Sequence, residues 1–315
     1  MLIHQILQLK YPIIQGAMSH ITKGTFAATV SNHGALGVIA TASLNAEQAN
    51  KEIMICRSLT KRPYAVNLML KNIHTKEIVD SIIQHRPMVV ITGASNPGPY
   101  MDKLKAAGIL VIPVVPSVAL AKRVASMGAD MVIVEGTEAG GHVGESTTMT
   151  LVPQVVDAVD IPVIAAGGIA DGRGVAAALT LGASGVQIGT LLMTSDECPI
   201  HQNYKSAIID AKDNDTVVIG RSIASPIRTL RNAMTQAYLQ LEKDGADKET
   251  LEHFVTGALK RAVEEGDMLR GSMMMGQIAG LIKETRPLQE ILDDLMTDTI
   301  KQHERLSMIM QQLTP

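Results

Sequence analysis

The residues with the clearest chemical potential lie in one short stretch, Val132 to Gly144, which reads VIVEGTEAGGHVG. An apolar run stops at Glu135, and the loop after it holds several glycines, a second carboxylate at Glu138 and a histidine at His142. A buried strand that opens into such a loop is typical of a site in a parallel sheet. Glycine lets the backbone approach a ligand closely, and histidine moves protons near neutral pH. A glycine-rich turn with an exposed histidine would give the same pattern.

Two further glycine clusters end later apolar runs. Gly167 and Gly168 follow one run, and Gly189 and Thr190 follow the next. Backbone N–H groups at the start of a helix bind an anion well where no side chain covers them. Because neither loop contains a Lys or Arg, the pattern predicts a phosphate group held by backbone dipoles. The alternative is that these glycines only allow tight turns.

A phosphate at this position indicates a bound cofactor or a phosphorylated metabolite. FMN, phosphorylated sugars and pyridoxal phosphate are the common candidates. Pyridoxal phosphate needs a strand-end lysine for its Schiff base, and no apolar run ends in one. Gly16, Ala17 and Met18 could form an apolar floor for a ring, and Asn67 could contact its polar edge. Core packing by Met18 and a backbone contact by Asn67 are the alternatives. No metal site is expected, because His142 has no His or Cys neighbour.

The elements that must position these residues alternate between short apolar runs and helix-like segments. The apolar runs are Ile13–Ile14, Ala35–Ile39, Tyr64–Met69, Met88–Ile91, Ile109–Val115, Met131–Val134, Val163–Ala165 and Gly185–Ile188. The helix-like segments are Thr22–Ser31, Asn45–Cys56, Lys76–His85, Gly98–Ala107, Val118–Met127, Leu151–Val159 and Gly172–Leu181. This alternation predicts parallel βα units.

An open doubly wound sheet and a closed barrel both fit such units, and two observations favour the barrel. Eight runs match the eight strands of a barrel. Polar, Gly or Pro residues follow nearly every run, whereas an open sheet concentrates its ligand residues at one switch point. No G-x-G-x-x-G motif follows the first run. The predicted fold is therefore α/β, a (β/α)8 TIM barrel.

The pattern changes after Thr190, where we expect a smaller helical domain inserted after the eighth strand. The predicted elements are helix Tyr204–Ala211, a β-like segment Thr216–Ile219, helix Ser225–Leu241, helix Leu251–Glu264 and a long amphipathic helix Leu288–Leu313. Ser225-Pro226 is a good cap and first-turn pair for the third of these. The expected domains are a barrel over 1–195, a substrate-covering domain over 196–270 and a C-terminal segment over 271–315 that returns to the barrel.

Composition excludes several classes of protein. The 315 residues include 28 basic and 31 acidic ones, for a net charge of -3, and no basic run indicates a nucleic-acid partner. No apolar stretch is long enough to cross a bilayer, and the N-terminus lacks a signal-peptide pattern. The two cysteines, Cys56 and Cys198, are expected to be reduced structural thiols. A soluble cytoplasmic protein is expected, without a membrane partner.

Motifs spread over most of the chain resemble one enzyme family. They are YPIIQGAM, VNLML, TGASNPGPYM, IPVVPSVALAKR, EGTEAGGHVGESTTMTLVPQVV, IPVIAAGGIADGRG, VQIGT and RGSMMMGQIAGL. Together they resemble the flavin-dependent enoyl-acyl-carrier-protein reductase II group, in the superfamily of nitronate monooxygenases (2-nitropropane dioxygenases). EAGGH and AAGGIADG are common to the superfamily, whereas TGASNPG, IPVVPSVALAKR and GHVGESTTMTL are more similar to the reductase branch.

The resemblance implies an FMN-binding barrel and assigns residues to it. Gly16, Ala17 and Met18 would run along the isoalloxazine ring, and Asn67 would contact the ring. Other residues implied near the cofactor are Gln154 and, at the phosphate, Gly167, Gly168, Gln187, Gly189 and Thr190. The residues that would face the substrate are Met274, Met275 and Gln277. His142 would stand near the flavin as the catalytic proton donor or base.

The resemblance implies reduction of the 2,3 double bond of enoyl-acyl-carrier-protein thioesters, with NADH or NADPH, in fatty acid biosynthesis. The partner, acyl carrier protein, is acidic, so a basic strip near the mouth is expected. The candidates for it are Arg228, Arg231, Lys260, Arg261 and Arg270. A monovalent cation at the Glu135–Glu138 loop and a homodimer are compatible with the sequence. The nearest rival function is nitronate monooxygenase, and a barrel that binds a phosphorylated metabolite without redox chemistry is the rival of a different class.

Overall fold

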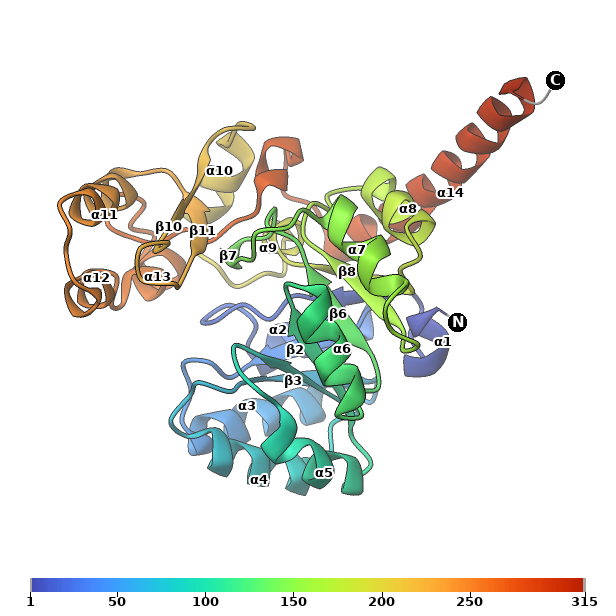
Figure 1. Cartoon of the computed structure of the whole chain (residues 1–315), viewed down its shortest axis with the longest axis horizontal. Coiled ribbons are helices and arrows are strands. Elements are labelled where there is room, and N and C mark those ends of the chain that lie inside the picture. Colours follow the sequence, from blue (N-terminus) through green and yellow to red (C-terminus); the bar gives the residue numbers. More distant parts are fainter. Residues whose placement is uncertain (1, 314–315) are drawn as a thin grey trace.

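The computed structural model describes residues 2–313 and shows a barrel with a smaller unit beside its mouth (Figure 1). Met1 and residues 314–315, which the predicted domain ranges include, lie outside the described residues. Eight parallel strands form a ring in the order β1-β9-β8-β6-β5-β4-β3-β2. A parallel bridge between Ile14 and Leu36 joins the first and last strands of this order. The predicted TIM barrel is confirmed.

The predicted βα alternation is confirmed to within a few residues at each boundary. The barrel strands are β1 (Ile13–Gln15), β2 (Gly37–Ala40), β3 (Tyr64–Met69), β4 (Val89–Gly93), β5 (Leu110–Val115), β6 (Val132–Glu135), β8 (Val163–Ala166) and β9 (Gly185–Ile188). The helices around them are α2 (Gly24–Asn32), α3 (Ala46–Leu59), α4 (Thr75–His85), α5 (Gly98–Ala106), α6 (Val118–Ser126), α7 (Thr148–Val156), α8 (Gly172–Thr180) and the short α9 (Thr190–Met193). A short helix that was not predicted, α1 (Ile3–Leu7), precedes them.

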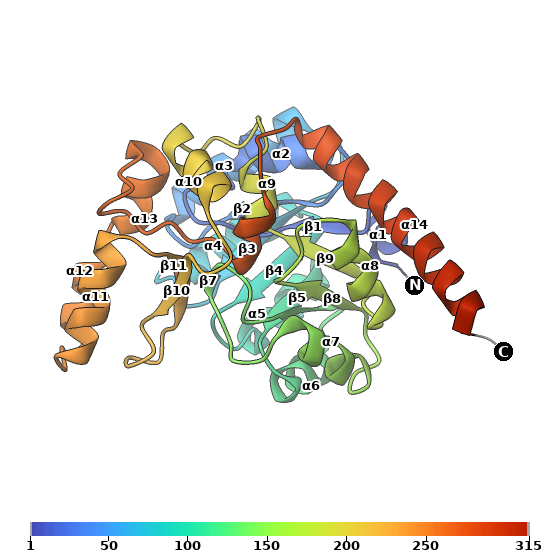
Figure 2. The same cartoon turned by 90° about the horizontal axis from the view of Figure 1, so that it is seen from above.

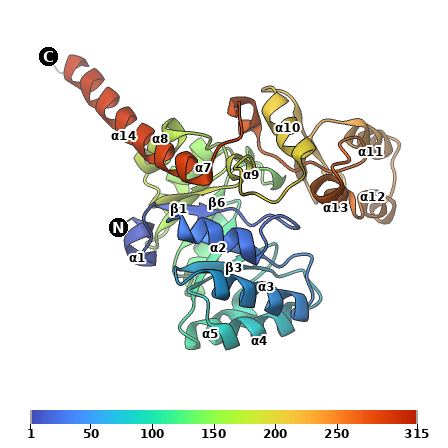
Figure 3. The same ribbon diagram turned by 180° about the vertical axis from the view of Figure 1, so that it is seen from behind.

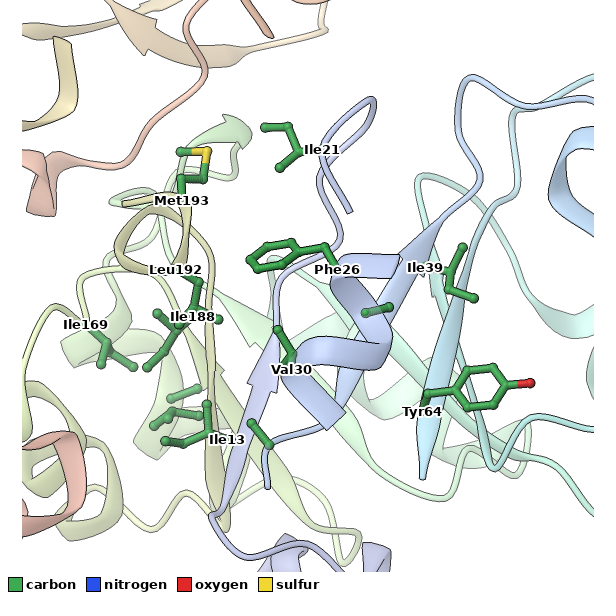
Figure 4. Packing of buried hydrophobic residues seen from close by; sticks show 14 of the residues in the cluster. Ile13, Ile21, Phe26, Val30, Ile39, Tyr64, Ile169, Ile188, Leu192 and Met193 are labelled. Atoms are coloured by element: carbon green, nitrogen blue, oxygen red, sulfur yellow. The ribbon is translucent and has the colours of Figure 1, made fainter. Parts of the chain in front are cut away.

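Two apolar layers hold the strands in place. Successive residues of a strand point to opposite faces, so Ala65 fills the barrel interior while Val66 packs toward the helices. Figure 4 shows part of the outer layer, where Phe26 and Val30 of α2 approach Ile188 of β9. Since both faces of each strand are buried, the strand ends at the mouth are fixed in position.

The smaller unit contains both helices and strands. Its elements are α10 (Gln202–Asp210), β10 (Thr216–Ile219), β11 (Ile227–Leu230), α11 (Ala233–Lys243), α12 (Lys248–Phe254), α13 (Ala258–Lys260) and a π-helical turn Arg261–Glu265. Beyond it lie a 3₁₀ turn, Gln277–Leu281, and α14 (Leu288–Leu313), which matches the predicted long helix. No helix in residues 2–313 is long and apolar enough to span a membrane.

Two helix predictions in this unit are wrong. The segment Ser225–Leu241 is not one helix, because Ile227–Leu230 pairs antiparallel with β10 over four residues and α11 begins only after Asn232. Asn232 is the better cap: its side chain accepts from the Thr235 N–H at 3.0 Å, and the Thr235 hydroxyl accepts from the Asn232 N–H at 2.8 Å. The predicted helix Leu251–Glu264 is interrupted at Gly257, whose φ is +73°.

A third strand joins the smaller unit to the barrel. β7 (Gly141–His142) lies in the loop after β6, yet it pairs antiparallel with β11, with Ile227 opposite His142 and Arg228 opposite Gly141. The three-stranded sheet β10-β11-β7 therefore contains residues from both units. Figure 2 shows this sheet at the edge of the barrel mouth. The ranges 1–195, 196–270 and 271–315 remain a prediction, with β7 belonging to the sheet of the second range.

The long helix α14 runs along α8 and continues past the barrel (Figure 3). The two helices meet at Gly172, where a Cβ would lie 2.4 Å from the Thr299 nitrogen and 2.4 Å from the Asp298 Cβ. The close approach therefore requires glycine at this position.

We predict that Gly172→Ala lowers the free energy of unfolding by about 1–3 kcal/mol, because the added methyl group forces α8 and α14 apart. The matched control is Gly93→Ala, where a Cβ would meet nothing within 4 Å. Urea unfolding followed by circular dichroism measures both variants. Equal midpoints for the two variants would contradict the packing described.

Candidate active site

The ends of β1 and β9 bring several predicted residues together at the mouth. The Gly16 N–H donates to the Ile188 carbonyl at 2.8 Å, and a Cβ on Gly16 would lie 3.3 Å from the Gly189 Cα. The Met18 sulfur lies 3.6 Å from the position of a Cβ on Gly189. Ala17 packs against the interior apolar layer. These residues form one small, largely apolar floor.

The glycine loops after β8 and β9 have the features of an anion cradle. Gly167 and Gly168 have φ angles of +91° and +74°, which side chains rarely allow. In residues 2–313, the backbone N–H groups of Gly168, Gly189 and Thr190 donate to no acceptor. The Thr190 hydroxyl accepts from the Gly276 N–H at 2.9 Å. Uncovered N–H groups beside an apolar floor fit a phosphate linked to a flat ring.

Two predicted amides lie near this floor, and a third does not. Asn67 is buried, and its Nδ2 donates to the Ile91 carbonyl at 3.4 Å. Its side-chain oxygen accepts no hydrogen bond in the described chain. Gln187 pairs in register with Ile14 of β1. Gln154 lies apart from both. It is exposed on α7, and its Nε2 donates to the Thr150 carbonyl at 2.6 Å, so the structure does not bring it to the site.

The loop after β6 is held by the Glu138 carboxylate and by the glycine-rich segment 271–280. Both Glu138 oxygens accept from the Thr148 N–H at 3.0 Å, and one of them also accepts from the Thr148 hydroxyl at 3.0 Å. The Gln277 N–H donates to the Glu138 carbonyl at 2.9 Å. A Cβ on Gly140 would lie 2.6 Å from the Met275 carbonyl carbon. Glu138 therefore has a structural use, at the first turn of α7.

His142 is exposed, and the charge of Lys71, in the loop after β3, acts on its ring. Desolvation, reinforced by the positive charge of Lys71, lowers the pKa of the imidazole below its usual value. Neither ring nitrogen has a hydrogen-bond partner in the described chain, so no protein group fixes the tautomer there. A neutral imidazole can accept a proton, or donate one to a strong base that develops during a reaction.

The residues predicted to face the substrate lie in the segment after residue 270. The Tyr204 hydroxyl donates to the Met274 carbonyl at 2.8 Å, and the Met274 sulfur lies 3.7 Å from the position of a Cβ on Gly141. This places Met274 beside the histidine strand. Met275 is fully buried, whereas Gln277 is exposed.

Glu135, for which the sequence suggested a place at a cation site, is a titratable group at the mouth. It ends β6, is half-buried, and its side chain makes no hydrogen bond or ion pair in residues 2–313. Desolvation raises the pKa of its carboxyl to about 7. The signal in the sequence was a carboxylate directly after a continuous apolar run. A carboxyl with this pKa is half protonated near neutral pH, which suits proton transfer.

The predicted basic strip is wrong for Arg228, which is 7% exposed and points into the protein. Lys260 and Arg270 are exposed but form ion pairs with Glu264 and Asp267. Arg261 donates to the Thr256 carbonyl at 3.3 Å. The last of the set, Arg231, lies exposed at the end of β11.

The two cysteines are structural, as predicted. Cys56 and Cys198 are free and buried, and burial raises the pKa of each thiol to about 12, so neither is a thiolate near neutral pH. In residues 2–313, no three His, Cys, Asp or Glu side chains gather in a way that could hold a metal ion.

Comparisons with known proteins agree on one family. The family model described as nitronate monooxygenase matches residues 1–81 and 72–298. FabK from Thermotoga maritima superposes with a TM-score of 0.94 at 42% identity, over 97% of each chain. A probable nitronate monooxygenase from Staphylococcus saprophyticus is 34% identical over 88% of this chain and 92% of its own. A Rhodococcus jostii protein named (3aS,4S,5R,7aS)-5-hydroxy-7a-methyl-1-oxo-octahydro-1H-indene-4-carboxyl-CoA dehydrogenase is 32% identical over 96% of both.

We predict a pH-dependent gain in stability for Glu135→Gln. Since the folded pKa of about 7 lies above the ordinary 4.5, the stability that this carboxyl contributes is full below about pH 4.5 and is lost as the pH rises through about 7. The variant should therefore match the parent near pH 4 and be more stable near pH 8. Urea midpoints at the two pH values measure this, and an equal difference at both would contradict the raised pKa.

Proposed function

The chain belongs to the nitronate monooxygenase family, and we propose that within it the protein is an FMN-dependent enoyl-acyl-carrier-protein reductase. It would use NAD(P)H to reduce the 2,3 double bond of the thioester, a step of fatty acid biosynthesis. The observation that carries this proposal is the likeness to FabK over nearly the whole chain, together with the motifs that resemble the enoyl-acyl-carrier-protein reductase II group. The Rhodococcus relative supports a thioester substrate, since its name describes a carboxyl-CoA compound.

The mouth fits FMN on two independent features. The uncovered N–H groups of Gly168, Gly189 and Thr190 suit its phosphate, and the floor of Gly16, Ala17 and Met18 suits a flat ring. The free oxygen of Asn67 can accept from the polar edge of such a ring. When bound, FMN supplies hydride transfer between NAD(P)H and the β-carbon of the thioester. A pyridoxal or metal reaction has no comparable support in the residues described.

The proposed role of His142 follows from its position and its protonation state. Hydride addition at the β-carbon leaves negative charge on the thioester oxygen and the α-carbon, and a proton must then reach the α-carbon. His142 is exposed in the loop after β6, and no protein partner competes for its ring nitrogens in the described chain. His142 therefore delivers this proton, directly or through water. Glu135 is the second titratable group that can supply one.

The partner of this reaction is acyl carrier protein carrying the enoyl chain, and the expected place is the cytoplasm. The proposal includes either NADH or NADPH as the reductant. It also includes a bound monovalent cation and a homodimer, which binding and oligomeric-state measurements test. Of the cations proposed to attract the acidic partner, Arg231 is the exposed one without a side-chain ion pair in residues 2–313.

Nitronate monooxygenase is the second candidate function, favoured by the family model and by the Staphylococcus relatives. Its chemistry would use the same mouth and the same cofactor, with oxygen as the electron acceptor. His142 would then accept a proton from the nitro compound rather than donate one.

We predict that the purified protein binds FMN and oxidises NADH or NADPH anaerobically when an enoyl thioester such as crotonyl-CoA or crotonyl-acyl carrier protein is added. The reduced nicotinamide is followed by its absorbance, with the saturated thioester identified by mass spectrometry. Oxygen-dependent consumption of a nitronate without any thioester-dependent oxidation would contradict the reductase and favour the second candidate. A colourless protein that takes up no FMN would contradict both.

We further predict that His142→Ala retains FMN but reduces enoyl turnover by about 10²–10⁴-fold, as expected for loss of general acid catalysis. Flavin content and the dissociation constant of FMN provide the control for folding. His33→Ala is a matched variant, because that histidine bonds the Thr29 carbonyl on α2, away from the mouth. Unchanged turnover in His142→Ala would remove this residue from the mechanism.

A further inference from the structure

Arg228 of the smaller unit reaches into the loop that carries His142. Its Nε donates to the Thr137 carbonyl at 3.0 Å, and its Nη1 donates to the Thr216 hydroxyl at 3.0 Å. The side chain is 7% exposed and makes no ion pair in residues 2–313. The Arg228 guanidinium lies between the two units and binds the Thr137 carbonyl, three residues before Gly140 and Gly141 in the loop after β6.

Such a placement is costly. A buried charge without a hydrogen-bonded carboxylate loses hydration that neutral oxygens only partly replace. Desolvation lowers the pKa of the Arg228 guanidinium, and the carboxylate whose negative charge opposes this shift, Glu138, is already bonded to Thr148. A neutral side chain of similar size would fill this position at lower cost, so packing alone does not account for an arginine here.

The backbone around Arg228 shows what the guanidinium restrains. Arg228 lies opposite Gly141 in the β11–β7 pairing, and the Val143 N–H donates to the Pro226 carbonyl at 3.2 Å. The strand β7 has only two residues, and Gly141 has a φ of +80°. Thr148 and Gln277 hold Glu138 in the middle of the loop, so the conformational freedom that remains lies around Gly141 and His142.

The contact to Thr137 restrains the other end of the same loop. Backbone pairing to β11 holds Gly141 and His142, and the Arg228 side chain holds the Thr137 carbonyl, in addition to the bond from the Thr137 N–H to the Ser146 carbonyl at 2.8 Å. The segment cannot shift without breaking a bond to a buried charge. Its position therefore depends on the position of the smaller unit.

We propose that Arg228 is a positioning residue that couples the smaller unit to the histidine of the site. With the guanidinium on the Thr137 carbonyl, the segment from residue 137 to 142 has one conformation, and the imidazole of His142 faces the mouth. Without it, the two-residue strand β7 exchanges among several. This inference rests on the proposed role of His142 in enoyl reduction.

The test uses Arg228→Gln, Arg228→Lys, His142→Ala and the double variant Arg228→Gln/His142→Ala. We expect Arg228→Gln to slow enoyl turnover by about 10–100-fold through misplacement of the imidazole, with flavin content and anaerobic reduction by NADH unchanged. The turnover of Arg228→Lys should lie between those of the parent and Arg228→Gln, since an ammonium keeps the charge but cannot make the two hydrogen bonds of the planar guanidinium. The double variant should be no slower than His142→Ala, because both changes act through one group.

Arg221→Gln is the matched control. Arg221 also links the smaller unit to the chain after His142, through an ion pair with Glu145, but that pair is exposed and should contribute little. Amide hydrogen exchange supplies a readout besides activity. Arg228→Gln should speed exchange in residues 137–143 at least severalfold, while Arg221→Gln should leave it unchanged.

The outcomes separate the inference from the proposed function. If His142→Ala slows enoyl turnover but Arg228→Gln does not, the positioning role of Arg228 is wrong. It is also wrong if the turnover of the double variant falls by the product of the two single-variant factors. If His142→Ala is unaffected, the proposed role of His142 falls, and exchange alone decides for Arg228. Faster exchange confined to residues 137–143 would then support positioning, and unchanged exchange would overturn it.

Discussion

The antiparallel pairing of β7 with β11 is the constraint on which the site depends. It takes two residues from a barrel loop, Gly141 and His142, and makes them the edge of a sheet whose other strands belong to the smaller unit. Barrel strands fix the side of the mouth at the ends of β1, β8 and β9, because both their faces are buried. The histidine side is fixed only once the smaller unit is in place. The site therefore consists of a rigid half and a half whose geometry depends on contacts between units.

Glycine allows the close contact between the loop after β6 and the segment 271–280, and desolvation sets the protonation of the titratable groups beside it. Gly140 and Gly276 let the site loop and the late segment touch backbone to backbone, since a Cβ on either would lie under 3 Å from main-chain atoms of the other segment. Desolvation disfavours the charged form of both titratable groups, so their pKa values shift in opposite directions. The pKa of Glu135 rises to about 7, while that of His142 falls. An uncharged form of each group is therefore populated near neutral pH.

Much of the barrel could be predicted from the sequence because its signals are local. Strands buried on both faces read as apolar runs, and the glycines at Gly167, Gly168 and Gly189 mark strand ends whatever the rest of the chain does. The failures share a different cause. Ile227–Leu230 looked helical after Ser225-Pro226, but pairing with β10 and β7 overrode the local preference. Arg228 looked like a surface charge because burial between units leaves no mark in one sequence. Gln154 was assigned by motif alone, and its helix carries it away from the mouth.

The central claim is that this mouth passes a hydride to an enoyl thioester and that His142 completes the reduction with a proton. The most direct measurement is a single turnover in which the anaerobically reduced holoenzyme is mixed rapidly with enoyl thioester, oxygen or nitronate in separate experiments. The account predicts that the thioester reoxidises the flavin at least as fast as steady-state turnover, and that oxygen does so far more slowly. Reoxidation by oxygen that outpaces a negligible reaction with the thioester would contradict it.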